Sequence, residues 1–148
     1  MSALEQLLTD HDNAILARLR EHDYLTPVVF KGKVPRLPDG TIRNAYINVH
    51  ASGRPYVAER RDGRRVQVAR SYLINAVSTD PAEVERLQGA VVAQLLDFRP
   101  TIPGRNAWRL AYEASTAMRP DESTTPWLWY TTDQFDLNTT PARGGTHG

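Results

Sequence analysis

The sequence predicts an α+β fold: a mostly antiparallel β-sheet with two α-helices packed on one face, plus a projecting β-hairpin or loop. Apolar residues recur every three or four positions in residues 2–23 and 80–98, which is the spacing of a helix face. They recur every second position in residues 45–52, 65–80 and 126–137, which is typical of half-buried strands. The order helix, strands, helix, strands indicates an α+β fold with both helices on one face of the sheet.

The first helix has a defined start and one apolar face. Ser2 and Glu5 have the spacing of a capping box, in which each side chain bonds the other residue's backbone. His11 lies on the apolar stripe, and we expect it to be a histidine at the edge of the core with one hydrogen bond, because no second ligand-type residue accompanies it. The stripe consists of Leu4, Leu7, Leu8, His11, Ile15 and Leu19.

A short strand and a loop are predicted for residues 24–40, where prolines and an Asp-Gly turn interrupt two apolar pieces. Residues 45–52 then alternate as a half-buried strand, with His50 on the polar face. Residues 65–80 give the clearest strand pattern, and Arg70 interrupts its apolar side. That side consists of Val66, Val68, Tyr72, Ile74 and Ala76.

A basic hairpin tip is predicted just before that strand, because Asp62-Gly63 is a hairpin-turn dipeptide. Three interpretations stay open for it: a solvated hairpin end, a contact with an acidic protein partner, or a contact with DNA phosphates. A net charge of +1 makes the phosphate contact the weakest of the three. The candidate interface residues of this tip are Arg60, Arg61, Arg64 and Arg65.

The second helix is marked at both ends. Asp80 is placed as its cap, Pro81 occupies its first turn, and Pro100 forces the chain out of the helix within the sequence LLDFRP. Gly104 then allows the following turn to close. Gly89 lowers the helix propensity, which indicates a close approach of this helix to the sheet.

Two final strands are expected at residues 107–118 and 126–137, joined by a polar loop at 119–125. Trp127 and Trp129 make the last strand aromatic, and Tyr130 adds an aromatic side chain on its other face. A strand that is apolar on both faces is buried on both, either inside the domain or by a neighbouring subunit.

The composition sets the domain count and excludes several function classes. A chain of 148 residues with 41% hydrophobic residues suits one domain, which we assign to residues 1–137, with a flexible tail at 138–148. The chain has no cysteine, no signal peptide and no long apolar run, which predicts a protein that is made in the cytosol and does not enter a membrane. No nucleophile–base pair, metal-ligand spacing or phosphate-binding fingerprint occurs. We therefore predict no catalytic, cofactor-binding or metal-binding residues.

Three stretches resemble the tail terminator (tail completion) proteins of long-tailed, siphovirus-like bacteriophages, especially those of actinobacterial phages. They are HDYLTPVVFKGKVPRLPDGT at 22–41, SYLINAVSTDPAEVERLQGAVVAQLLDFRPTIPGR at 71–105 and WYTTDQFDL at 129–137. The resemblance implies a small α+β domain without catalytic residues that forms a homo-hexameric ring. That ring caps the tail tube, ends its polymerisation and presents a surface for head–tail joining.

The same resemblance implies the partners and the location. The partners are further copies of the chain, the major tail tube protein and the head-completion proteins of the neck, with DNA only as cargo passing through the ring. The location is the virion, at the junction of tail and neck. Arg99 and Arg105 are candidates for pairing with carboxylates of the next subunit, although arginines at this junction equally suit the last carbonyls of the helix.

Two alternatives remain open at the level of sequence. One is another neck protein, either a head-closure or a connector subunit, because these are also small ring-forming proteins. The other is a small ligand-binding or enzymatic α+β domain with an unrecognised pocket.

Overall fold

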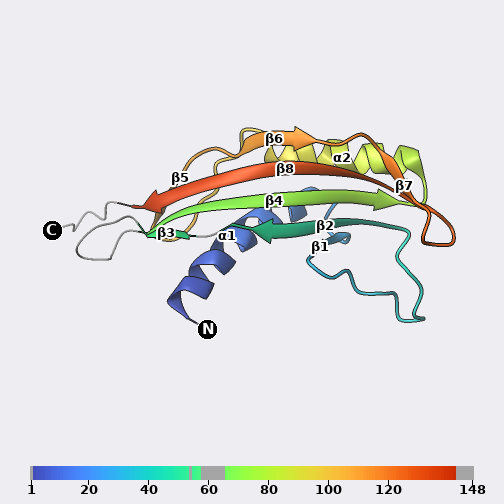
Figure 1. Cartoon of the computed structure of the whole chain (residues 1–148), viewed down its shortest axis with the longest axis horizontal. Coiled ribbons are helices and arrows are strands. Elements are labelled where there is room, and N and C mark those ends of the chain that lie inside the picture. The colour runs from blue at the N-terminus through green and yellow to red at the C-terminus, as the bar shows by residue number, and fades with distance from the viewer. Residues whose placement is uncertain (1, 54, 58–65, 143–148) are drawn as a thin grey trace.

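The computed structural model describes residues 2–53, 55–57 and 66–142 and confirms the α+β fold. One eight-stranded sheet carries two helices on one face (Figure 1). The helices are α1 (Ala3–Arg20) and α2 (Pro81–Leu95). The strands are β1 (Val29–Lys31), β2 (Ala45–Ser52), β3 (Pro55–Val57), β4 (Val66–Ser78), β5 (Arg105–Ala107), β6 (Ala111–Ser115), β7 (Arg119–Asp121) and β8 (Leu128–Pro141).

The long antiparallel pair β4 and β8 forms the centre of the sheet, whose main order is β1-β2-β4-β8-β5. Strand β2 pairs antiparallel with the other side of β4, and β1 pairs parallel with β2, so the sheet is mixed at that edge. Strands β5, β6 and β7 follow one another along the outer side of β8, all antiparallel to it. The two edges of the sheet are therefore built from different pieces of chain.

The hydrophobic core lies between the helices and one face of the central strands. Alternation in β2, β4 and β8 places their apolar side chains on this face, and the stripes of both helices meet them there. The sheet contributes Ile47, Val49, Tyr72, Ile74, Phe135 and Leu137, and the helices contribute Ile15, Leu19, Val84, Leu87, Val91 and Leu95.

The predicted caps of both helices and the predicted end of α2 are confirmed. The Ser2 hydroxyl accepts the Glu5 N–H at 3.1 Å, which is one of the two bonds of the predicted capping box. The Asp80 carboxylate accepts the Ala82 N–H at 3.0 Å. Helix α2 ends at Leu95, ahead of Pro100 as expected. Gly104 has φ +70° in the following turn, a conformation that glycine adopts without steric cost.

The strand predicted at 107–118 is split, and the predicted loop 119–125 contains β7. The split has a local cause: the Leu110 N–H donates to the Phe98 carbonyl at 2.8 Å, and Leu110 is buried. This contact draws the chain away from β8 toward the end of α2, so β5 and β6 form separate pairings with β8.

The last strand extends beyond the predicted boundary of the C-terminal tail. Strand β8 runs to Pro141 and buries Thr139, although the sequence predicts a flexible segment from residue 138. A hydrophobicity pattern does not predict this continuation, because its residues are polar. Thr139 is buried, and its hydroxyl is hydrogen-bonded to His11 and Arg105. Residues 143–148 of the predicted tail lie outside the described residues.

The expected close approach at Gly89 is wrong. Gly89 is exposed on α2, and a Cβ atom added there meets no atom within 4 Å. By contrast, Gly53 has φ +116°, and a Cβ there would stand 2.3 Å from the Ala69 carbonyl oxygen. The backbone conformation of Gly53 and its close approach to β4 thus require glycine, whereas Gly89 only lowers the stability of its helix.

We predict that Gly89→Ala raises the free energy of unfolding by about 1 kcal/mol, because alanine loses less backbone entropy than glycine in a helix. Chemical denaturation followed by circular dichroism measures the change. Gly53→Ala is the matched control and should destabilise the protein, since its backbone conformation and its space both exclude a side chain. A loss of stability in Gly89→Ala would contradict the placement of α2.

Candidate interface and buried polar network

The predicted interface residues fall into separate parts of the structure. Arg60, Arg61, Arg64 and Arg65 lie outside the described residues. The structure describes only the base of the predicted hairpin, where β3 pairs antiparallel with β4 from Pro55↔Val68 to Val57↔Val66. The role of this arginine tip stays a prediction.

Arg99 and Arg105 have different surroundings. Arg105 is half-buried in β5, where its Nε donates to Thr139 Oγ1 and its Nη2 to the Thr139 carbonyl, both at 3.1 Å. Burial lowers the pKa of Arg105. Arg99 is exposed and forms no hydrogen bond or ion pair with another described residue, so it does not bind the last carbonyls of α2.

The two tryptophans also differ. Trp129 is half-buried against the core, whereas Trp127 precedes β8 and is 50% exposed. Beyond them the two faces of β8 separate clearly: Phe135 and Leu137 are buried on the core face, and Gln134 and Asp136 lie half-buried on the other. Within the described chain, the face of β8 away from the core is fully buried only at Leu128, and its next side chains up to Asp136 are half-buried.

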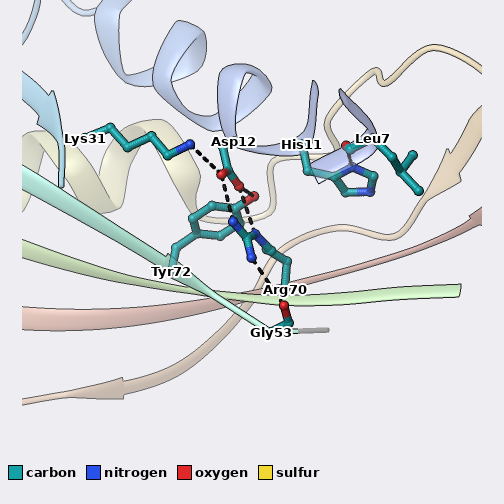
Figure 2. A network of polar contacts seen from close by, with 7 residues as sticks. All are labelled: Leu7, His11, Asp12, Lys31, Gly53, Arg70 and Tyr72. Carbon is teal, nitrogen blue, oxygen red and sulfur yellow. Dashed lines mark hydrogen bonds and ion pairs between the residues drawn. The ribbon is translucent and has the colours of Figure 1, made fainter. Parts of the chain in front are cut away.

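A buried carboxylate joins α1 to the sheet (Figure 2). Asp12 Oδ1 accepts from Arg70 Nε at 3.0 Å and from the Tyr72 hydroxyl at 2.9 Å. Asp12 Oδ2 accepts from Arg70 Nη2 at 2.9 Å and from Lys31 Nζ at 2.8 Å. The second Arg70 terminal nitrogen, Nη1, donates to the Gly53 carbonyl at 3.2 Å. One side chain of α1 thus binds β1 and β4 together.

The electrostatics of this network favour the charged carboxylate. Asp12 is 2% exposed, and burial alone would raise its pKa. The hydrogen bonds from its three partners outweigh burial and hold the pKa of Asp12 below its ordinary value. Burial, followed by the charge of Asp12, raises the pKa of Tyr72, so its hydroxyl remains a donor. The bidentate geometry of Arg70 fixes the orientation of both charged groups.

His11 forms a second buried chain of hydrogen bonds beside Asp12. Its Nδ1 lies 2.7 Å from the Leu7 carbonyl, which can only accept, so Nδ1 carries the proton. Its Nε2 lies 2.7 Å from Thr139 Oγ1 and accepts from that hydroxyl, which in turn accepts from Arg105. The predicted core-edge histidine is therefore fully buried and makes two hydrogen bonds instead of one.

Asp12 is the residue that the sequence prediction missed. Its position on α1 borders the apolar stripe, and Arg70 interrupts the apolar side of β4. Two charges of opposite sign, one beside and one within an apolar face, are a signal of a buried ion pair, since an unpaired charge there is costly. This signal appears only when Asp12 and Arg70 are considered together.

These buried groups are arranged to hold structure. Each Asp12 oxygen already accepts two hydrogen bonds, and both ring nitrogens of His11 are engaged. No group of three or more His, Cys, Asp or Glu side chains able to hold a metal ion occurs among the described residues. Within the same part of the chain, neither helix is long and apolar enough to cross a bilayer.

We predict that Asp12→Asn lowers the free energy of unfolding by about 3–5 kcal/mol, because it leaves the buried Arg70 charge without its carboxylate. Urea unfolding at neutral pH measures the loss. Lys31→Met is the graded comparison, and it should cost no more than about 1 kcal/mol because the Lys31 side chain is 42% exposed. Equal losses in the two variants would contradict the central place of the Asp12–Arg70 pair.

We predict that His11 makes the protein less stable in mild acid. Burial lowers the pKa of His11 from its ordinary 6.5, so below that pH the unfolded chain binds a proton that the folded chain does not. The contribution is fully present above pH 6.5 and decreases as the pH falls. Asp12 acts in the same direction but only as the pH falls below 3.8, the ordinary value for its carboxyl.

The measurement is the free energy of unfolding from about pH 7 to about pH 5 for the wild-type protein and His11→Gln. Glutamine does not titrate in this range, so the variant should show a flatter slope, whatever its absolute stability. Parallel slopes in the two proteins would contradict a buried neutral His11.

Comparison with known proteins finds a similar fold among solved structures but no matching family. No family model matches the sequence, and no curated protein matches it. Among solved structures, a chain of the "Virion of native gene transfer agent (GTA) particle" is similar, with a TM-score of 0.65 and 16% sequence identity. The match covers 95% of this chain and 99% of that chain. The whole fold described above is therefore shared with a component of a virion particle.

Proposed function

We propose that this chain is a structural protein of a phage-type virion and that it acts as a tail terminator. In this role six copies form a ring that caps the tail tube, ends its polymerisation and offers a surface to the neck. The observation that carries the proposal is the match with a chain of a gene transfer agent virion, which extends over nearly the full length of both chains. A match over nearly the whole of both chains is what a shared architectural role would produce.

The buried polar groups support a scaffold role. Asp12 and His11 are the two buried ionisable residues of α1. Both form hydrogen bonds that hold this helix to the sheet. Buried hydrogen-bonded groups fix the position of a helix on a sheet. Here Asp12 joins α1 to Arg70 of β4, and His11 joins it to Thr139 of β8. A fixed position is useful in a ring, because every subunit must present the same pair of surfaces to its two neighbours.

The asymmetry of the sheet supports a head-to-tail ring. One edge is the short parallel strand β1, and the other consists of β5, β6 and β7. Contacts between unlike surfaces close into a ring when the rotation between subunits allows it. Large apolar side chains available for such contacts are exposed at several places, including Trp108, Tyr112 and Trp127.

We predict that imaging of assembled particles shows this protein as a single sixfold ring at the head-proximal end of the tail. The ring ends a polymer because its two faces differ, so that only one of them matches the tube. Immunogold labelling combined with cryo-electron microscopy measures its position. A ring on the head side of the neck would instead assign a head-closure or connector role, and density along the tube or at the distal tip would contradict the proposal.

We predict that Arg99→Glu weakens ring assembly in a salt-dependent manner. Arg99 is exposed and unpaired within the described chain, so reversal of its charge removes no internal contact. Assembly is measured by sedimentation at low and high salt, and unfolding curves confirm that the fold is kept. Arg99→Lys is the matched control and should assemble as the wild type. Wild-type assembly by Arg99→Glu would remove Arg99 from the subunit boundary.

A further inference from the structure

A groove lies at the end of the sheet where two connections meet. Figure 1 shows the β1–β2 connection and the β7–β8 connection at this end, opposite to β3. Between them is a hollow of about 550 Å³, lined on one side by residues of 36–44 and on the other by Thr124, Thr125, Pro126 and Leu128. Thr79, at the end of β4, forms part of its wall.

Two smaller hollows continue this one. A hollow of about 260 Å³ shares Arg36, Ile42 and Arg43 with it. A hollow of about 170 Å³ on the open face of the sheet shares Leu128 with the first and Tyr46 with the second. We call the three together the loop groove. Their shared walls make one continuous depression from the β1–β2 connection to the open face.

The loop groove is basic at the β1–β2 connection. Lys33, Arg36 and Arg43 line the 260 Å³ hollow, and none of them forms an ion pair with another described residue. The nearest acid in sequence, Asp39, accepts instead from the Thr41 N–H at 3.0 Å and from the Thr41 hydroxyl at 2.6 Å. No described carboxylate therefore lies within ion-pair distance of these three side chains. Among the described lining residues of the loop groove, the carboxylate Asp121 belongs to the 170 Å³ hollow on the open face of the sheet.

Backbone carbonyls fix the two arginines. Arg36 Nη1 donates to the Gly40 carbonyl at 3.1 Å, and Arg43 Nε donates to the Pro35 carbonyl at 2.8 Å. The Arg43 guanidinium also stacks over the Phe30 ring at 4.8 Å from its centre. These contacts hold the side chains in place while leaving their charge and most of their donors available, which lowers the entropy cost of binding an anion.

The rim of the loop groove is apolar. Ile42 is 40% exposed and forms part of two of the hollows, and Pro126 and Leu128 line the hollow of 550 Å³. An exposed apolar side chain beside organised arginines is typical of protein interfaces, in which arginine is enriched. A fitting ligand therefore carries both carboxylates and apolar groups.

We propose that the loop groove binds a short extended segment of a partner protein in which Asp or Glu side chains stand next to apolar side chains. The carboxylates meet Lys33, Arg36 and Arg43, and the apolar side chains cover Ile42. A peptide fits better than nucleic acid, because the whole chain has a net charge of only +1 and the groove walls are partly apolar. This inference does not rest on the proposed ring.

The test is a selection of short random peptides displayed on a carrier against the immobilised full chain, followed by fluorescence anisotropy with the selected peptides. The double variant Lys33→Glu/Arg36→Glu reverses two exposed charges of the groove. Arg109→Glu is the charge control, because Arg109 is exposed and lines a different hollow with Trp108. Ile42→Ala and Leu73→Ala form a matched apolar pair at 40% and 41% exposure, because Ile42 lines the groove and Leu73 lines none of its three hollows.

The expected result is enrichment of peptides with adjacent acidic and apolar residues. Their dissociation constant should rise by about tenfold or more in the double variant, and it should also rise in Ile42→Ala. Arg109→Glu and Leu73→Ala should change it by less than about twofold. The proposal is overturned by selected peptides without carboxylates, by equal losses in the control variants, or by tighter binding of a single-stranded oligonucleotide at the same residues.

Discussion

The contact between Asp12 and Arg70 determines how the first helix meets the sheet. Helix α1 brings only part of its surface to apolar neighbours, and the carboxylate gives it a defined register on β4 and β1. The pair is buried and bidentate, and the Tyr72 hydroxyl completes the carboxylate's hydrogen bonding. The same side of α1 is held to β8 through His11 and Thr139. A shift of α1 along the sheet would separate these buried partners. Because a buried unpaired charge is costly, the pairing favours one position of α1 over shifted positions.

Polar contacts continue the central strands past the apolar core. The core extends along β8 as far as Leu137, which pairs with Arg70 of β4. At this end Arg70 donates to the Gly53 carbonyl, and Arg105 donates to Thr139. The polar extension supports the base of the β3–β4 hairpin and the start of β5.

The sequence predicts the elements that depend on local rules. Both helix starts follow from capping residues, the end of α2 follows from Pro100, and the main strands follow from alternation. It does not predict the contacts that depend on distant partners. The break between β5 and β6 comes from the Leu110–Phe98 contact, and the extension of β8 comes from the partners of Thr139. Likewise, the basic lining around Arg36 and Arg43 becomes a groove only because the β7–β8 connection folds beside it.

The β4–β8 pair has a mechanical consequence. Eleven consecutive residue pairs, from Val68↔Thr139 to Ser78↔Trp129, join two antiparallel strands without interruption. Hydrogen bonds in such a ladder stand perpendicular to the strands, so a pull along the strand direction loads them all at once. A pull at right angles would instead open them one after another from an end. The domain is therefore stiff along its longest strands and yields most easily at its edges, where β1 and the short strands β5, β6 and β7 are held by only a few pairings each.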